Sequence, residues 1–146
     1  MRIIIQRVKQ ASVVIDKKTY SSINSGLLCL VGFCNDDTKD DFIWASNKVF
    51  NLKVFKDEKS LKEIKGGGLL IVSQFTLFAS IKKGMKPSWS KAANASSAQL
   101  LYNQFIDICK EKEYDNIQTG VFGANMDINS INDGPFTLMI DTKKRE

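Results

Sequence analysis

The stretch GLLIVSQFTLF, residues 68–78, is largely apolar over the length of a β-strand. This pattern is typical of a strand buried inside a sheet, and we predict a strand over residues 69–78. A second stretch, GLLCLVGFC at residues 26–34, is apolar on both strand faces and predicts a central buried strand. The rest of the chain must therefore supply the elements that cover these two strands.

Two amphipathic helices are expected beside them. Thr38 and Asp41 resemble a capping box, and apolar residues then recur at spacings of three and four, which predicts a helix over 38–51. A similar stripe predicts a second helix over 96–111. The apolar positions of the two stripes are Phe42, Ala45, Val49, Leu52, Ala98, Leu101, Phe105 and Ile108.

Shorter strands complete the expected fold. We predict a polar turn at Lys9-Gln10 between the first two strands. The strands are expected at residues 1–8, 11–16, 19–23, 52–55, 117–122, 126–131 and 136–141. Runs of strands separated by only two helices indicate one α/β domain over 1–146, with a mixed, largely antiparallel β-sheet and two main helices.

The composition restricts the chemistry that the chain can perform. There is no histidine among the 146 residues, which excludes Ser-His-Asp and Cys-His nucleophiles and His-ligated zinc. We expect no metal and no cofactor. The three cysteines are expected to be reduced core thiols.

The net charge of +5 mildly favours an anionic partner such as nucleic acid, the alternative being a protein that merely has a basic surface. The longest apolar stretch, residues 26–34, is too short to span a bilayer, and the N-terminus lacks signal-peptide features. We therefore expect a cytoplasmic protein without a membrane partner.

Polar residues close the apolar stretch at 68–78. Ser73, Gln74 and Thr76 follow the apolar residues directly, with Phe75 among them. Buried polar groups need hydrogen-bond partners, so either the core satisfies them or they line a pocket at the end of the strand.

Basic residues accumulate in two other places. In KGMKPSW, residues 83–89, Lys83 and Lys86 accompany Trp89, which suits a phosphate and a stacked base, although a plain surface loop is an equal alternative. Lysines also recur every third residue over 53–65. In a helix they would spread around most of the surface, so we predict a solvated hairpin or loop, the alternative being a phosphate-binding stripe.

Two residues that break strands, Gly134 and Pro135, stand at the entrance of the strand predicted for 136–141. Proline has no N–H group and belongs at the beginning of a strand or at a bulge. An ordinary trans proline is one interpretation. A cis bond that turns its carbonyls toward a ligand is the other.

Together these residues resemble a known family. SQFTL at 73–77 and NDGPFT at 132–137 resemble the two signature motifs of the D-aminoacyl-tRNA deacylases of the bacterial and eukaryotic type. KGMKPSW at 83–89, TGVFGANM at 119–126 and QRV at 6–8 are similar to further stretches of that family, in the same order. The resemblance covers nearly the whole chain.

The resemblance implies an enzyme that hydrolyses the ester joining a D-amino acid, or glycine, to the 3′-terminal adenosine of tRNA. It implies a homodimer in which the cis Gly134–Pro135 unit of one subunit enters the pocket of the other. There its carbonyls capture the α-amino group of the substrate, and its backbone excludes L-amino acids. Arg7 resembles a family residue that braces these carbonyls.

The resemblance also implies roles for the other residues. The amides of Phe75 and Thr76 are our candidates for an oxyanion site, and the 2′-hydroxyl of the tRNA assists water. The Thr76 hydroxyl as nucleophile ranks second, because no base would activate it. The remaining assignments are Ser73 and Gln74 for adenosine, Met126 for the pocket lining, and Lys83, Lys86 and Trp89 for tRNA. A nucleic-acid-binding module without catalysis and a general esterase are the alternatives.

Overall fold

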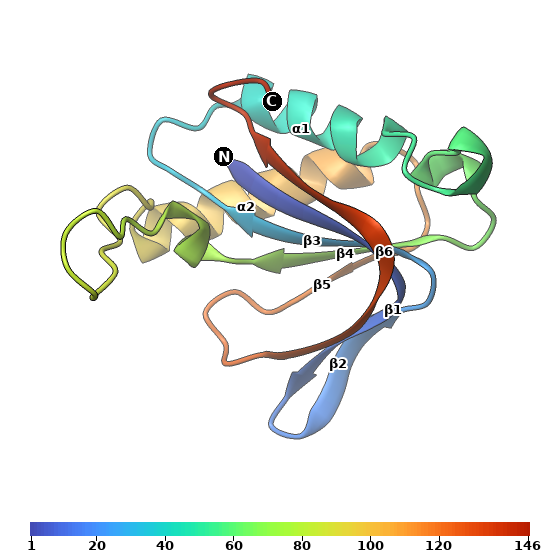
Figure 1. Cartoon of the computed structure of the whole chain (residues 1–146), viewed down its shortest axis with the longest axis horizontal. Coiled ribbons are helices and arrows are strands. Elements are labelled where there is room, and N and C mark those ends of the chain that lie inside the picture. Colours follow the sequence, from blue (N-terminus) through green and yellow to red (C-terminus); the bar gives the residue numbers. More distant parts are fainter.

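Two α-helices cover one face of a six-stranded β-sheet in the computed structural model, which describes residues 1–146 (Figure 1). The strand order is β2-β1-β3-β4-β5, and β6 lies along the other edge of β1. β1 is antiparallel to β2, β3 and β6, whereas β3, β4 and β5 are parallel. The strands are β1 (Arg2–Ile15), β2 (Lys18–Ile23), β3 (Gly26–Gly32), β4 (Gly68–Ser73), β5 (Ile117–Thr119) and β6 (Asp127–Asp141). The predicted α/β fold, with a mixed, largely antiparallel β-sheet and two helices, is confirmed.

The two central strands are apolar on both faces because each face contacts a hydrophobic cluster. The larger cluster lies between the sheet and the helices, where the rings of Phe33, Phe42 and Phe105 meet edge to face at 5.8 and 6.1 Å. The smaller cluster, on the opposite face, includes Leu28 and Leu70. No helix of the protein is both long and apolar enough to cross a membrane.

The turn predicted at Lys9-Gln10 is wrong, since β1 continues through it for 14 residues. Between the pairs Val8–Asn132 and Gln10–Ile131, β1 advances two residues while β6 advances one. Lys9 is therefore the extra residue of a bulge, and its exposed side chain explains the polar signal.

The strand predicted over 69–78 ends early, at Ser73. The Gln74 amide still donates to the Val31 carbonyl, but the chain then forms a short 3₁₀ helix, η3 (Phe75–Phe78). Hydrogen bonds from Leu77 to Gln74 and from Ala79 to Thr76 close this turn. The polar SQFT segment thus leaves the sheet at the end of β4, where its side chains are half-buried or exposed.

The predictions for the last strands also need correction. β5 ends at Thr119, and the strands predicted at 126–131 and 136–141 are one continuous strand, β6. Gly134 and Pro135 consequently lie inside a strand rather than at its beginning. Between the pairs Gln6–Thr137 and Val8–Asn132, β1 advances two residues while β6 advances five. Gly134 and Pro135 therefore lie in a bulge of β6 that has three extra residues. The strand predicted at 52–55 is absent apart from an isolated bridge at Phe55.

The two helices are α1 (Lys39–Asn51) and α2 (Ala95–Lys110), close to the predicted bounds. The capping box is present: the Asp41 amide donates to the Thr38 hydroxyl at 3.4 Å, and the Thr38 amide donates to the Asp41 carboxylate at 2.9 Å. Burial alone would raise the pKa of Asp41, but hydrogen bonds from Lys143 and Thr38 lower it to about 2.

We expect Thr38→Ala to lower the free energy of unfolding by about 1 kcal/mol, because the first turn of α1 loses its side-chain cap. Urea denaturation followed by circular dichroism measures this. Thr38→Ser keeps the hydroxyl and should stay near the wild-type midpoint. An alanine variant with an unchanged midpoint would show that the cap contributes nothing.

Candidate active site

A hollow of about 300 Å³ opens where β4 ends. Its lining comes from two segments far apart in the chain, the end of β4 with the start of η3, and the connection from β5 to β6. The lining residues are Val72, Ser73, Gln74, Phe75, Gly123, Ala124, Asn125, Met126 and Ile128. Of the two interpretations of the polar segment, the structure shows a pocket for Ser73 and Gln74, whereas Thr76 is not part of its lining.

Two backbone donors stand beside this hollow. Phe75 and Thr76 are the first residues of η3, where amide groups have no carbonyl partner within the turn. None of the backbone hydrogen bonds in turns and loops engages either amide. Phe75 lines the hollow. Thr76 is the next residue of the turn and is not part of the lining of the hollow.

The hollow contains no ionisable side chain. Its polar groups are hydroxyls, amides and backbone groups, none of which is a general base near neutral pH. The Thr76 hydroxyl accepts a hydrogen bond from Gln74 Nε2, an amide donor that cannot remove its proton. This favours the amides over the Thr76 hydroxyl as the catalytic groups.

The cysteines supply no alternative nucleophile. All three are free, and Cys29 and Cys109 are buried in the core, as predicted. Burial raises the pKa of Cys109 to about 12 and that of Cys29 further, which keeps both thiols protonated. Burial also raises the pKa of Cys34, which is half-buried.

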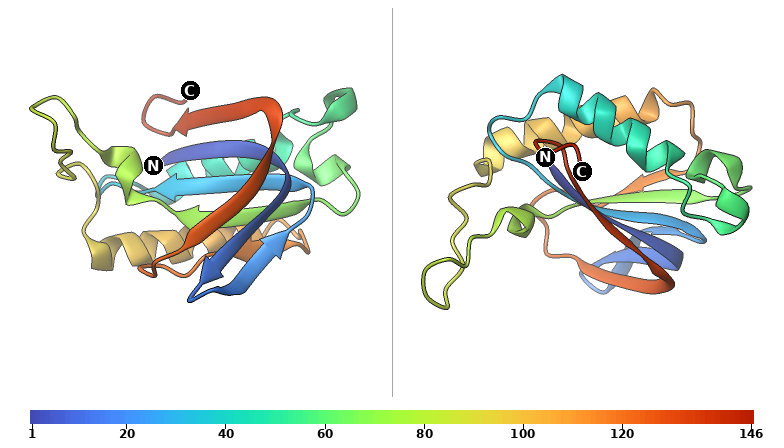
Figure 2. Two further views of the ribbon diagram at one scale, coloured as in Figure 1. Left: turned by 60° about the horizontal axis from the view of Figure 1, so that its bottom comes forward. Right: turned by 45° about the horizontal axis from the view of Figure 1, so that its top comes forward.

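The basic loop over residues 79–94 follows η3 and projects from the rest of the molecule (Figures 1 and 2). Its base is fixed by paired hydrogen bonds between Ser80 and Ser88, at 2.9 and 3.0 Å. The Trp89 ring packs edge-on against Phe75 with a centroid distance of 5.2 Å. Lys83 and Lys86 are exposed on the projecting part. The loop thus places Trp89 next to a residue that lines the hollow, and it carries two exposed cations on its projecting part.

The Gly134–Pro135 bond is cis, as the resemblance implied. Arg7 holds the bulge that contains it: Nη2 donates to the Gly134 carbonyl and Nε to the Asp133 carbonyl, both at 3.1 Å. The guanidinium also forms an ion pair with the Asp133 carboxylate at 3.0 Å and lies over the Phe136 ring. Arg7 therefore fixes the direction of the Gly134 carbonyl.

The Gly134–Pro135 bulge and the hollow lie at opposite ends of the sheet. The bulge begins at Asn132, which pairs with Val8, beside the start of β4; the hollow lies at Ser73, where β4 ends. A six-residue strand spans about 17 Å between them. One chain therefore brings Ser73, Gln74, Phe75 and Met126 together, but not Gly134, Pro135 or Arg7.

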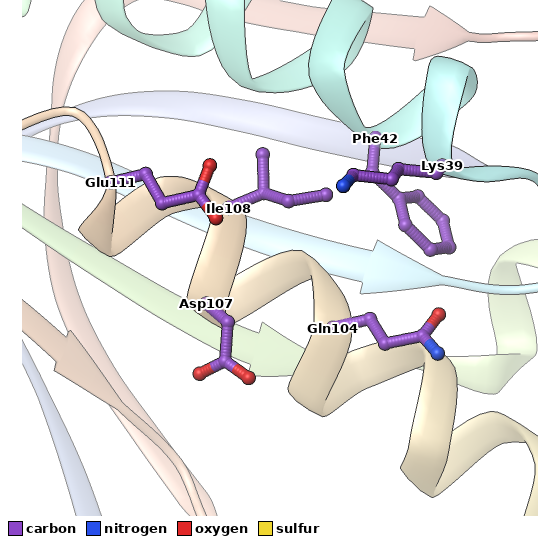
Figure 3. Close-up of a pocket in the computed structure, with 6 residues that line it drawn as sticks. All are labelled: Lys39, Phe42, Gln104, Asp107, Ile108 and Glu111. Carbon is purple, nitrogen blue, oxygen red and sulfur yellow. The ribbon is translucent and has the colours of Figure 1, made fainter.

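A second hollow of about 300 Å³ lies between α1 and α2 (Figure 3). Lys39 extends from α1 toward Ile108 of α2, and Phe42 lines the hollow from the same helix. The other lining residues are Gln104 and Asp107 of α2 and Glu111 at its C-terminal end. It contains none of the residues that the sequence analysis selected for the functional site.

The sequence analysis missed part of the site. Gly123, Ala124 and Asn125 line the hollow next to Met126, which alone was selected from TGVFGANM. Gly123 has a φ of 79°, in the left-handed region that glycine favours, and so permits the turn that brings this segment to β4. The Gly-Ala-Asn run after a short strand is the signal that identifies such a turn.

Known proteins resemble the chain throughout. A family model described as D-Tyr-tRNA(Tyr) deacylase matches residues 4–141. Proteins named D-aminoacyl-tRNA deacylase from Clostridium novyi and Clostridium acetobutylicum are 51% and 44% identical, each over 99% of both chains.

Solved structures agree on the fold. The c-Myc DNA Unwinding Element Binding Protein is similar with a TM-score of 0.87 and 35% identity, covering 97% of this chain and 98% of its own. A probable eukaryotic D-amino acid tRNA deacylase superposes with a TM-score of 0.81 at 18% identity, covering 95% and 97%. With the family model spanning both signature segments and relatives matching end to end, the chain belongs to the D-Tyr-tRNA(Tyr) deacylase family.

Proposed function

We propose that the protein hydrolyses the ester of D-aminoacyl-tRNA, releasing free tRNA and the D-amino acid. The observation that carries this proposal is the hollow formed by SQF and GANM, which has backbone donors and no ionisable side chain. An aminoacyl ester is already activated, so such a site needs to orient the ester and stabilise charge rather than supply a strong nucleophile.

The proposed reaction begins with the 3′-terminal adenosine held by Ser73 and Gln74, and the amino-acid end against Met126. Water attacks the ester carbonyl, assisted by the 2′-hydroxyl of the terminal ribose. The oxyanion that develops accepts hydrogen bonds from the Phe75 and Thr76 amides, which the start of η3 leaves without internal partners. The 3′-hydroxyl of the tRNA then leaves.

We expect Thr76→Ala to retain turnover within about tenfold of wild type, because the backbone amide remains and the hydroxyl has no base to activate it. The assay is the release of D-tyrosine from D-tyrosyl-tRNA at saturating enzyme. Thr76→Val, of similar shape, is the control for packing. Complete loss of turnover in a folded Thr76→Ala protein would favour the nucleophile model.

We also propose a homodimer in which Gly134–Pro135 of one subunit completes the pocket of the other. Two observations support it. The bulge and the hollow are too far apart to cooperate within one chain. β6 is an edge strand whose outer side has no partner, and Ile131 and Met139 on it are 50% and 63% exposed.

This arrangement explains chiral selection. In D- and L-substrates held by the same amino group and ester, the side chain and the α-hydrogen exchange places. Backbone of the Gly134–Pro135 unit that occupies the L side-chain position excludes L-amino acids, while glycine, with two hydrogens, is accepted and cleaved. Arg7 keeps the Gly134 carbonyl in one direction, as its contact at 3.1 Å indicates.

Lys83, Lys86 and Trp89 are proposed to contact the tRNA near its 3′ end, where cations meet phosphates and an indole stacks on a base. Two observations support this: Trp89 packs on Phe75, which lines the hollow, and Lys83 and Lys86 are exposed on the same loop. A substrate of this kind places the protein in the cytoplasm. No cofactor is needed for the reaction.

Nucleic-acid binding without turnover is the second candidate, favoured by the name of a structural neighbour at 35% identity, a DNA-element binding protein. Cleavage of D-tyrosyl-tRNA by the purified protein separates the two. A general esterase would instead cleave simple D-amino-acid esters as fast as charged tRNA.

A further inference from the structure

A cationic hollow lies next to the Gly134–Pro135 bulge. It has a volume of about 340 Å³ and is formed by the loop after α1 together with Arg7. Its lining residues are Arg7, Ser25, Phe55, Lys56, Asp57, Lys59, Ile64, Lys65 and Asp133. Three of the five regularly spaced lysines of residues 53–65 therefore meet in one place.

The other two lysines of that run do not line the hollow and have partners of their own. Lys53 forms an ion pair with Glu63, and Lys62 lies over the Phe50 ring at 5.9 Å. Lys56, Lys59 and Lys65 are exposed and form no ion pair.

Two carboxylates also line the hollow. Asp133 is neutralised by Arg7, so Asp57 alone opposes the three lysines. The loop is tightly turned, with Asp57 and Glu58 in the left-handed region and the Phe55 amide bonded to the Lys59 carbonyl. This turn holds Lys56 and Lys59 near each other, and the hollow keeps an excess of positive charge.

Arg7 connects this hollow to the bulge. Its guanidinium donates to the Val54 carbonyl on the loop side and to the Gly134 carbonyl on the other. The loop and the Gly134–Pro135 unit are therefore parts of one assembly. Wherever the Gly134–Pro135 unit docks, the three lysines arrive beside it.

We propose that Lys56, Lys59 and Lys65 bind phosphates of the tRNA whose 3′ end occupies the pocket of the partner subunit. The inference rests on the proposed function, since it requires the Gly134–Pro135 unit to enter that pocket. The incoming unit then carries a cationic surface to the pocket mouth, opposite Lys83 and Lys86 of the subunit that owns the pocket. One tRNA is thus held by both subunits.

The first test neutralises the three lysines together, as Lys56→Gln, Lys59→Gln and Lys65→Gln. We expect kcat/KM for D-tyrosyl-tRNA to fall about tenfold near 0.1 M salt, with kcat unchanged, since each phosphate contact contributes to binding. The slope of log(kcat/KM) against log[salt] should flatten by about 2. Cleavage of 3′-O-D-tyrosyl-adenosine, which has no phosphate, should not change.

The matched control neutralises three exposed lysines of the helical face, Lys39→Gln, Lys48→Gln and Lys110→Gln. It changes the net charge equally and should change kcat/KM by less than about twofold and leave the salt slope unchanged. Equal losses in both triple variants would mean that only overall charge matters, and would overturn the proposal.

A mixed dimer tests whether the lysines serve the partner. One subunit carries Ala124→Trp, which fills its pocket, so only the other pocket works. Placing the lysine triple in the blocked subunit should lower kcat/KM about tenfold, whereas placing it in the working subunit should leave kcat/KM intact. The reverse pattern would overturn the proposal.

A binding assay keeps this inference separate from the proposed function. If wild type cleaves no D-tyrosyl-tRNA, the proposed function fails, yet the affinity of labelled uncharged tRNA still decides the role of the lysines. The lysine triple should then weaken tRNA binding and leave the binding of inorganic phosphate undetectable in both proteins. Equal tRNA affinity of the lysine triple and wild type contradicts the proposal, and so does a site that binds inorganic phosphate through these lysines while tRNA affinity does not depend on them.

Discussion

Gly134→Val is expected to lower kcat/KM for D-tyrosyl-tRNA by about 100-fold without changing the free energy of unfolding. A Cβ at position 134 would meet only Asn132 Nδ2, at 3.9 Å, so the single chain has room for a side chain there. In the proposed dimer the same position faces the amino group and α-carbon of the substrate in the other subunit. A displacement of about 1 Å at a reacting centre is enough for a 100-fold loss.

The measurement pairs D-tyrosyl-tRNA cleavage with urea denaturation. The kcat/KM of Gly134→Ala should lie between those of wild type and Gly134→Val, because the smaller side chain intrudes less. Ser22→Val, exposed on β2 and remote from both signature segments, should behave as wild type in both assays. A fully active Gly134→Val protein would show that no substrate or partner approaches this residue, as would an active monomer that still rejects L-substrates.

Substrate that ends in 2′-deoxyadenosine is expected to react roughly 10²–10⁴-fold more slowly than normal D-tyrosyl-tRNA, the usual contribution of a positioned acid–base group. The physical reason is the absence of any ionisable side chain from the lining of the hollow. With no protein base available, the ribose hydroxyl is the remaining group placed to assist water. Single-turnover rates at saturating enzyme measure the chemical step.

Binding of the deoxy substrate provides its control. The dissociation constant should stay within about tenfold of that for normal tRNA, since one hydroxyl contributes about 1 kcal/mol to binding. Undiminished cleavage of the deoxy substrate would require a base from the protein, and Thr76 held by Gln74 would then have to be reconsidered.

The sequence predicted those elements whose apolar residues recur with a regular spacing and whose ends are marked by turn or capping residues. β3, α1 and α2 appear close to their expected bounds because each has an uninterrupted apolar pattern. Two of the errors share one cause: local polar or strand-breaking residues were taken as the ends of strands. Lys9 occupies a bulge of β1, and Gly134–Pro135 occupies a bulge of β6. A bulge is held by the neighbouring strand, which single-sequence patterns do not show.

The site was predictable only in part. The resemblance selected Ser73, Gln74, Phe75 and Met126, which the fold brings to one hollow. Gly123 and its neighbours were missed because they carry no group of distinctive chemistry. The gathering of Lys56, Lys59 and Lys65 beside Arg7 depends on how the loop turns and packs, which the three-residue spacing does not determine.

The most direct test of the account is deacylation of matched D- and L-tyrosyl-tRNA by the purified protein under identical conditions. The account predicts that kcat/KM for the D-substrate exceeds that for the L-substrate by at least about 100-fold. Glycyl-tRNA should be cleaved as well. Comparable cleavage of D- and L-tyrosyl-tRNA, or no cleavage of the D-substrate, would contradict it.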